Sequence, residues 1–195
     1  MKRKSIIGID LAGKETNPTG FAVLKHKKIE TSSVYTDEEI LDEILRTKPV
    51  IVAIDAPLKP PKKGALRRAD RELIKKGYRV FPPGLSAMKT LTIRATKLNK
   101  LITEKGLKTI EVHPTSTRKA LNMPVKDWKT IQVIFKDLGL KGTLEKRRLT
   151  PHEIDAVTAA LTAHLHTQGL TETVGDDDEG FIIIPKKGDW REIRL

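Results

Sequence analysis

The sequence predicts an α/β fold with a five-stranded mixed sheet, three antiparallel strands followed by two parallel ones, flanked by helices. Three runs rich in β-branched residues follow one another with short loops between them, at residues 5–10, 19–24 and 28–35. Two later runs, 50–54 and 109–113, each follow a helical pattern. A strand reached through a helical crossover is most simply parallel to its predecessor, so we expect the first and fourth strands to be neighbours.

The first run, SIIGID, is typical of a buried strand and brings Asp10 to its carboxyl end. Residues 14–18 carry turn chemistry, so the run at 19–24 continues as a hairpin and 28–35 as a third strand. A carboxylate at the end of a buried strand is costly unless a cation or a hydrogen-bond network compensates it. Because of this cost, we look for further carboxylates in the sequence.

Thr36 begins a capping box and predicts a first helix that ends before Pro49. The apolar run that follows is closed by Asp55, at the same end of the sheet as Asp10. We expect further helices over residues 65–76 and 86–104. Ser86 is the predicted cap of the second of these, and its predicted polar face holds Lys89, Arg94, Lys97 and Lys100.

Residues 109–113 (TIEVH) alternate, with Glu111 and His113 on one face of a brief strand. Helical patterns follow over 115–121 and 125–138. The clearest helix runs from about 150 to 167, with Thr150 as N-cap, Pro151 at the first helical position and Glu153 three residues after the cap.

Length and patterning indicate a single domain, residues 1–195, with 169–195 as a C-terminal extension. In that extension, 176–179 is an acidic run that we interpret as a solvated turn, and 181–185 (FIIIP) is a candidate edge strand or packing segment. Cysteine is absent, which excludes disulfides, thiolate catalysis and Cys-ligated zinc and fits a reducing cytoplasm. No apolar window suggests a signal peptide or a membrane span, so we expect a cytoplasmic protein.

The 37 Lys and Arg residues against 25 Asp and Glu give a net charge of +12 and favour a polyanionic partner such as nucleic acid. A charged fraction of 32% is also typical of thermophile surfaces. A thermophilic origin would explain the large number of charged residues better than it explains the excess of positive charge. Only 4% of the residues are aromatic, so a broad base-stacking platform is not expected and recognition should be mainly of the backbone.

Asp10 and Asp55, at the ends of neighbouring strands, would repel each other, and a bound cation is the simplest way to keep both ionised. Asp155, in the first turn of the last helix, is the third candidate. Three carboxylates without a thiolate favour Mg²⁺ or Mn²⁺. A pair of such ions can hold a phosphodiester and activate a water.

Other polar residues have a functional and a structural interpretation. Glu153 fits a capping box better than a metal ligand. His152 shares the helix face of Asp155 and could touch substrate or metal, or neither. Glu111 and His113 could support the site, although the polar face of an edge strand gives the same pattern.

The arginines Arg67, Arg68 and Arg71 could grip phosphates, but a solvated helix face has the same pattern. His164 and His166 lie near a helix end, where histidine interacts favourably with the helix dipole. We assign no chemical role to them.

The spaced motifs GIDLAG, TGFAVL, AIDAPL, ADREL, EVHPTSTRKAL and HEIDAVTAALTA resemble a largely uncharacterised family of predicted nucleases with the ribonuclease H fold. The resemblance runs from Ser5 to about Leu170 and extends distantly to Holliday-junction resolvases. It implies a metal-dependent nuclease with Asp10, Asp55 and Asp155 as its acids, and its motifs include Glu111 and His113. Many ribonuclease H enzymes have Glu where this chain has the shorter Asp55.

The leading hypothesis is therefore a nuclease that uses Mg²⁺ or Mn²⁺ on single-stranded or branched DNA, with RNA as the less favoured substrate. A homodimer is compatible with the sequence. The alternative is a catalytically silent nucleic-acid-binding protein on the same fold. An actin-like or sugar-kinase-like phosphotransferase opens with a similar strand, acid and glycine-containing hairpin, but that fold needs two such halves around a nucleotide cleft and this chain has one.

Overall fold

The computed structural model describes residues 5–195. The first half of this region contains four strands and three helices, in the order β1 (Ser5–Asp10), β2 (Thr19–Lys25), β3 (Lys28–Val34), α1 (Asp37–Thr47), β4 (Ile51–Asp55), α2 (Arg68–Lys75) and α3 (Ser86–Glu104). The second half contains β5 (Thr109–Val112), α4 (Pro114–Ala120), α5 (Trp128–Asp137), β6 (Lys141–Gly142), α6 (Thr143–Lys146), α7 (Pro151–Thr167), β7 (Thr171–Asp176), β8 (Gly180–Pro185) and a 3₁₀ turn, η1 (Trp190–Glu192).

One mixed sheet joins all these strands in the order β6-β3-β2-β1-β4-β5-β8-β7. Its middle confirms the predicted arrangement, because β2 pairs antiparallel with β1 and β3, whereas β4 is parallel to β1 and β5. The predicted fold class is confirmed. The predicted count of five strands is wrong, since the sheet has eight among the described residues.

The extra strands come mainly from the C-terminal region. β8 pairs parallel with β5, whose outer edge would otherwise be unpaired, and β7 pairs antiparallel with β8. The segment 181–185 is therefore an inner strand, and its prediction as an edge strand is wrong. Residues 177–179 of the acidic run form the turn of this hairpin, whereas Asp176 ends β7. The prediction of a solvated turn is wrong for Glu179, which is buried and accepts the backbone N–H groups of Lys62 and Arg68.

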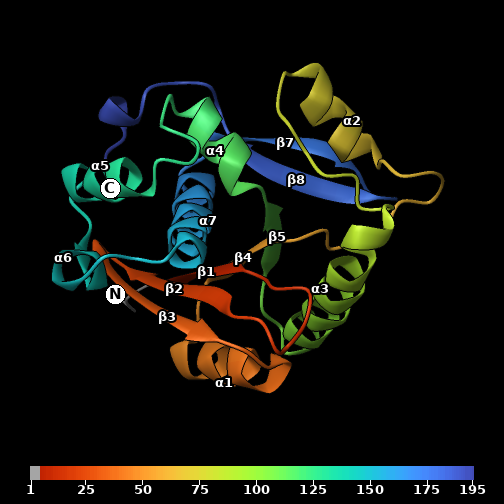
Figure 1. Ribbon diagram of the computed structural model, residues 1–195, viewed down its shortest axis with the longest axis horizontal. Coiled ribbons are helices and arrows are strands. Elements are labelled where there is room, and N and C mark those ends of the chain that lie inside the picture. The colour runs from red at the N-terminus through yellow and green to blue at the C-terminus, as the bar shows by residue number, and fades with distance from the viewer. Residues whose placement is uncertain (1–4) are drawn as a thin grey trace.

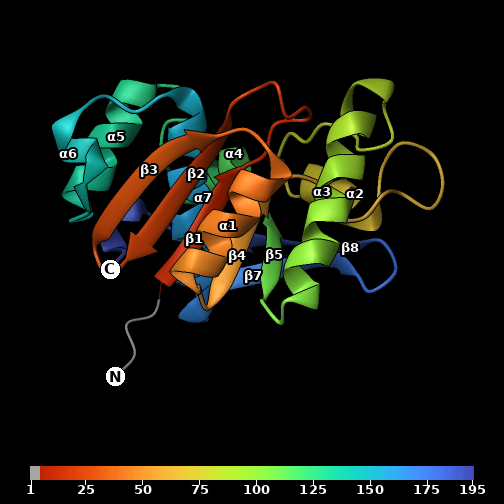
Figure 2. The same cartoon turned by 90° about the horizontal axis from the view of Figure 1, so that it is seen from below.

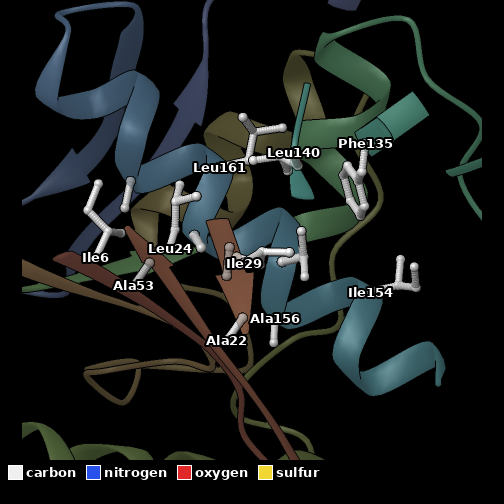
Figure 3. Packing of buried hydrophobic residues seen from close by; sticks show 14 of the residues in the cluster. Ile6, Ala22, Leu24, Ile29, Ala53, Phe135, Leu140, Ile154, Ala156 and Leu161 are labelled. Carbon is white, nitrogen blue, oxygen red and sulfur yellow. The ribbon is translucent and has the colours of Figure 1, made fainter. Parts of the chain in front are cut away.

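Helices cover both faces of the sheet. α7 lies across the middle strands on one face, and α1 and α3 cover the opposite face (Figures 1 and 2). The alternation along β1 explains both layers, because Ile6 belongs to the core under α7 whereas Ile7 and Ile9 belong to the core under α1 and α3. Figure 3 shows the first of these cores, in which Ile154 of α7 and Phe135 of α5 are buried with side chains from the strands.

Two glycines let α7 lie close on the sheet. A Cβ atom added to Gly8 would lie 2.1 Å from the carbonyl oxygen of Ala156, and one added to Gly20 would lie 2.1 Å from that of His152. Only a residue without a side chain fits at such distances. Because Gly20 is opposite Asp10 in the β1–β2 pair, this contact fixes the first turn of α7 beside the end of β1.

The predicted capping boxes at Thr36 and Thr150 are both present. Two expectations for the helix at 86–104 are wrong. Ser86 is its first residue rather than its cap, because Leu85 occupies the N-cap without a side-chain bond. Arg94 is buried rather than on the polar face, since its guanidinium donates to Asp37 and to two backbone carbonyls. Among the described residues, no helix has the length and apolar character needed to cross a membrane.

Candidate active site

The carboxyl ends of β1 and β4 place two aspartates side by side. Asp10 and Asp55 are direct partners in the parallel register of these strands, as the sequence predicted. Neighbouring strands lie about 4.8 Å apart, so the two carboxylates come from adjacent backbone positions at one edge of the sheet. The loop after β1 and the first turns of α3 lie along this same edge (Figure 2).

Asp55 experiences the strongest electrostatic perturbation in this group. Burial raises the pKa of Asp55 well above its usual value, and the charges of Asp10 and Asp155 raise it further. Arg118 opposes this effect in part. The three predicted acids, far apart in the sequence, therefore lie within one another's electrostatic field.

His152 contacts Asp10 directly. Its Nδ1 lies 2.6 Å from Oδ2 of Asp10, and the His152 side chain is 53% exposed. The hydrogen bond to Asp10 raises the pKa of His152, although partial burial acts in the opposite direction. Of the two interpretations of His152, the structure thus supports proximity to the acids, and contact with a substrate or a metal stays a prediction.

Asp155 is held by a buried arginine that the sequence interpretation did not single out. Arg118 of α4 is 1% exposed and donates to Oδ1 of Asp155, to Oγ1 of Thr158 and to the carbonyl of Val125. Its guanidinium also lies over the ring of Trp128, 5.3 Å from the centroid. Burial raises the pKa of Asp155, and the charge of Arg118 counteracts this shift.

Glu111 lies on the neighbouring strand β5, and both of its carboxylate oxygens accept hydrogen bonds. Arg67 donates to both of its carboxylate oxygens, over 2.5 and 2.8 Å, and the backbone N–H of Leu58 donates to Oε2 over 2.8 Å. Burial raises the pKa of Glu111, and the Arg67 guanidinium opposes the shift. Glu111 lines the same cavity as Asp10 and Asp55, and its role in support of the catalytic site stays a prediction.

Arg67 does not fit the predicted role of a phosphate contact. The side chain is 1% exposed, and its guanidinium is bound by Asp70 and Glu111. The carboxylate of Asp70 also accepts the backbone N–H of Arg67 and so caps α2. Asp70 and Glu111 accept four of the five N–H donors of the Arg67 guanidinium and the carbonyl of Lys59 accepts the fifth, so none is left for a substrate.

Arg68 and Arg71 remain exposed. Arg68 bonds Glu72 over 2.8 Å, and Arg71 lies 3.6 Å from Glu179 of the β7–β8 turn. The two guanidinium groups are exposed, although Glu179 itself is buried and also accepts the backbone N–H groups of Lys62 and Arg68, and phosphate contacts by Arg68 and Arg71 stay a prediction.

His113 ends β5 and is almost enclosed. Its Nδ1 lies 2.7 Å from Oγ of Ser116, and burial lowers the pKa of His113 to about 4. The imidazole is therefore neutral at pH 7. It can exchange a hydrogen bond with a substrate, but it supplies no positive charge to a phosphate.

Glu153 confirms the structural interpretation. Its carboxylate accepts from the backbone N–H of Thr150 in the capping box and from Arg147 and Thr31. These hydrogen bonds, and above all the pairing with Arg147, lower the pKa of Glu153 to about 2 against the effect of burial.

A cavity of about 260 Å³ opens beside the acids. Asp10, Asp55, Arg67, Glu111 and Phe81 are among the residues that line it. Its lining thus combines the predicted acids with residues from the loop before α3.

Residues 8–180 match a family described as "Protein of unknown function (DUF429)". The chain belongs to the DUF429 family. None of the curated proteins compared with it matches.

Two solved structures of RuvC from Thermus thermophilus are similar to this DUF429 protein. One is described as RuvC in complex with Holliday junction substrate, with 16% sequence identity and a TM-score of 0.55, covering 85% of this chain and 96% of the RuvC chain. The other, RuvC alone, has 17% identity and a TM-score of 0.51 with the same coverage. The DUF429 chain therefore has a ribonuclease H-like fold.

The donor set of the DUF429 site suits a hard divalent cation, because Asp10, Asp55 and Asp155 offer only carboxylate oxygens. In residues 5–195, however, no group of three Asp, Glu or His side chains is arranged as a ready-made metal site. Two of the acids are turned to partners within the chain, Asp10 to His152 and Asp155 to Arg118. The residues therefore fit a metal in their chemistry and placement, and binding would require these side chains to reorient.

Proposed function

We propose that this protein is a divalent-metal-dependent nuclease that hydrolyses phosphodiester bonds, with single-stranded or branched DNA as its preferred substrate. The observation that supports this most is the register that places Asp10 beside Asp55, combined with the raised pKa of Asp55. Two adjacent acids that resist joint ionisation form a site that favours a multivalent cation.

In this proposal, Asp10, Asp55 and Asp155 hold Mg²⁺ or Mn²⁺, and the bound ion would lower the pKa of a water and neutralise charge on the phosphate. His152 would orient the Asp10 carboxylate and hold a proton at Nδ1. Arg118 would position Asp155 and keep its carboxylate ionised at low metal concentration.

The polyanionic substrate is supported by the net charge of +12 and by the shared fold with RuvC, of which one structure is a complex with a Holliday junction. At 16% identity the likeness concerns the fold, so the DNA substrate is our proposal for this chain. A homodimer and a cytoplasmic location belong to the same proposal.

A second candidate function is nucleic-acid binding without catalysis. It is favoured by the hydrogen bond of Asp10 with His152 and the ion pair of Asp155 with Arg118, which give two of the acids polar partners within the chain itself. In this alternative, the acids stabilise the local structure only.

Cleavage assays separate the two candidates. Labelled single-stranded, branched and duplex oligonucleotides of DNA and RNA are incubated with the protein in Mg²⁺ or Mn²⁺. We expect cleavage of single-stranded or branched DNA that falls by more than about 100-fold in Asp10→Asn, a larger effect than the loss of an outer hydrogen bond to a metal ligand. Asp177→Asn, a change of an exposed acid in the β7–β8 turn, is the matched control and should cleave like the wild type.

Binding without cleavage in either metal, unchanged in Asp10→Asn, would support the silent alternative. The absence of both binding and cleavage would refute both candidates.

A further inference from the structure

The cavity beside the acids has a charge distribution that disfavours phosphate in its interior. Four carboxylates line it, those of Asp10, Asp55, Asp70 and Glu111, whereas Arg67 is its one lysine or arginine. That arginine is already bound by Asp70 and Glu111. A phosphate would find no available cation in the interior, so an uncharged group with hydrogen-bond donors suits the cavity better.

One wall of the same cavity is apolar and comes from the loop and helix start that follow α2. Val80, Phe81, Pro83, Met88 and Leu91 form it. Phe81 is 76% exposed, the highest value among the exposed large apolar side chains of the described residues. A phenylalanine so exposed on a cavity wall offers a face for stacking.

The size and position of the cavity further restrict which chemical group can occupy it. Its volume of about 260 Å³ exceeds the roughly 150 Å³ of a protein cavity that holds benzene. It is continuous with Asp10 and Asp55, so a group bound there would be joined closely to the phosphodiester at the acids. A planar, uncharged, aromatic group next to a phosphodiester is a nucleobase.

We propose that this cavity receives one unpaired nucleobase, stacked on Phe81, from the nucleotide adjacent to the phosphodiester at the acids. The proposal rests on the proposed function and specifies its substrate. A base enters only after leaving its stack, which costs a few kcal/mol in a duplex and less in single-stranded or branched nucleic acid. The cavity would thereby select single strands and branch points over continuous duplex.

The test measures binding without divalent ions, in EDTA, so that it is independent of cleavage. Fluorescence anisotropy is recorded with a single-stranded oligonucleotide and with a series carrying one abasic position each. Phe81→Ala should weaken binding of the intact single strand by about 5- to 150-fold, the range of one base–aromatic stack, and leave duplex binding unchanged. Phe81→Trp should restore binding. Phe181→Ala, a change of a 40% exposed phenylalanine that does not line the cavity, is the matched control.

The abasic series supplies the decisive comparison. At one abasic position, the wild type should bind the strand only as tightly as Phe81→Ala binds the intact strand. Phe81→Ala should bind this abasic strand and the intact strand with the same affinity. The proposal is overturned if Phe81→Ala binds every strand like the wild type, or if its loss is the same for duplex and single strand. Cleavage in Mg²⁺ with no effect of Phe81→Ala would refute the base site alone, whereas stacking without cleavage in any metal would refute the nuclease alone.

Discussion

Asp55→Asn should stabilise the metal-free protein at neutral pH. Asp55 is buried next to Asp10, forms no ion pair with a described residue, and has a pKa raised by burial and by the charges of Asp10 and Asp155. Asparagine keeps the shape of the side chain and removes its charge. The variant thus tests whether the paired acids are held together against their electrostatic preference.

The size of the effect follows from the register. Two unit charges about 5 Å apart, the spacing of adjacent strands, repel by about 3 kcal/mol at an effective dielectric constant near 20. Because Asp55 partly avoids this repulsion by binding a proton, we expect Asp55→Asn to raise the free energy of unfolding by about 1–3 kcal/mol at pH 8. For a chain of this length, such a gain raises Tm by roughly 2–12 °C.

The pH dependence has a definite sign. A carboxyl whose pKa is higher in the folded than in the unfolded state binds more protons when folded, so stability falls as pH rises from the unfolded pKa toward the folded one. Wild-type protein should therefore lose stability from about pH 4 upward, over the range that ends at the raised pKa of Asp55. Asp55→Asn should lack this loss, and the two proteins should converge near pH 4.

Urea denaturation between pH 4 and 8, with and without Mn²⁺, measures this difference. Mn²⁺ should stabilise the wild type and leave Asp55→Asn unchanged, because the ion replaces the proton at the acids. Asp177→Asn serves as the control for removal of an exposed negative charge. A lower stability of Asp55→Asn at pH 8, or a pH profile that matches the wild type, would refute the repulsion between the acids.

Two further substitutions test the framework of the site. Gly20→Ala would place a Cβ atom 2.1 Å from the carbonyl oxygen of His152, so it should cost at least about 1–3 kcal/mol in urea denaturation, whereas Gly13→Ala, with 3.5 Å to its nearest neighbour, should be near neutral; equal effects would refute the tight α7 contact. Arg67→Met leaves two buried carboxylates without their cation and should cost about 3–5 kcal/mol by the same measurement; a stable Arg67→Met protein would contradict the buried network. Arg68→Met removes only the pairs of an exposed guanidinium with Glu72 and Asp176 and should change little.

The order of the middle strands could be predicted because each depends on a local signal. The apolar runs mark the strands, and the helical patterns between 36 and 48 and between 65 and 104 make the later strands parallel. The pairing of Asp10 with Asp55 then follows from the common direction of β1 and β4. The place of β8 beside β5 could not be predicted in this way, because the short run at 181–185 does not indicate which edge it joins.

The arginines show where local patterns fail. Arg67 precedes a helix with a charged face and looks solvated, yet it pairs with Glu111, 44 positions away in the sequence. Arg118 lies on a seven-residue helix without an apolar stripe, and its partner Asp155 is 37 positions away. A buried arginine depends on such distant carboxylates, so its burial becomes visible only when the fold brings the partners together.

The same pairs explain why Asp55 governs the electrostatics of the site. His152 is hydrogen-bonded to Asp10 and Arg118 forms an ion pair with Asp155, whereas Asp55 forms no ion pair with a described residue, although the charge of Arg118 opposes the rise of its pKa. In the proposed function, a divalent ion would therefore relieve most repulsion at Asp55, where burial and the charges of Asp10 and Asp155 oppose ionisation. We expect metal affinity to be coupled to the ionisation of Asp55, whereas in the metal-free protein Asp10 contacts His152 and Asp155 contacts Arg118.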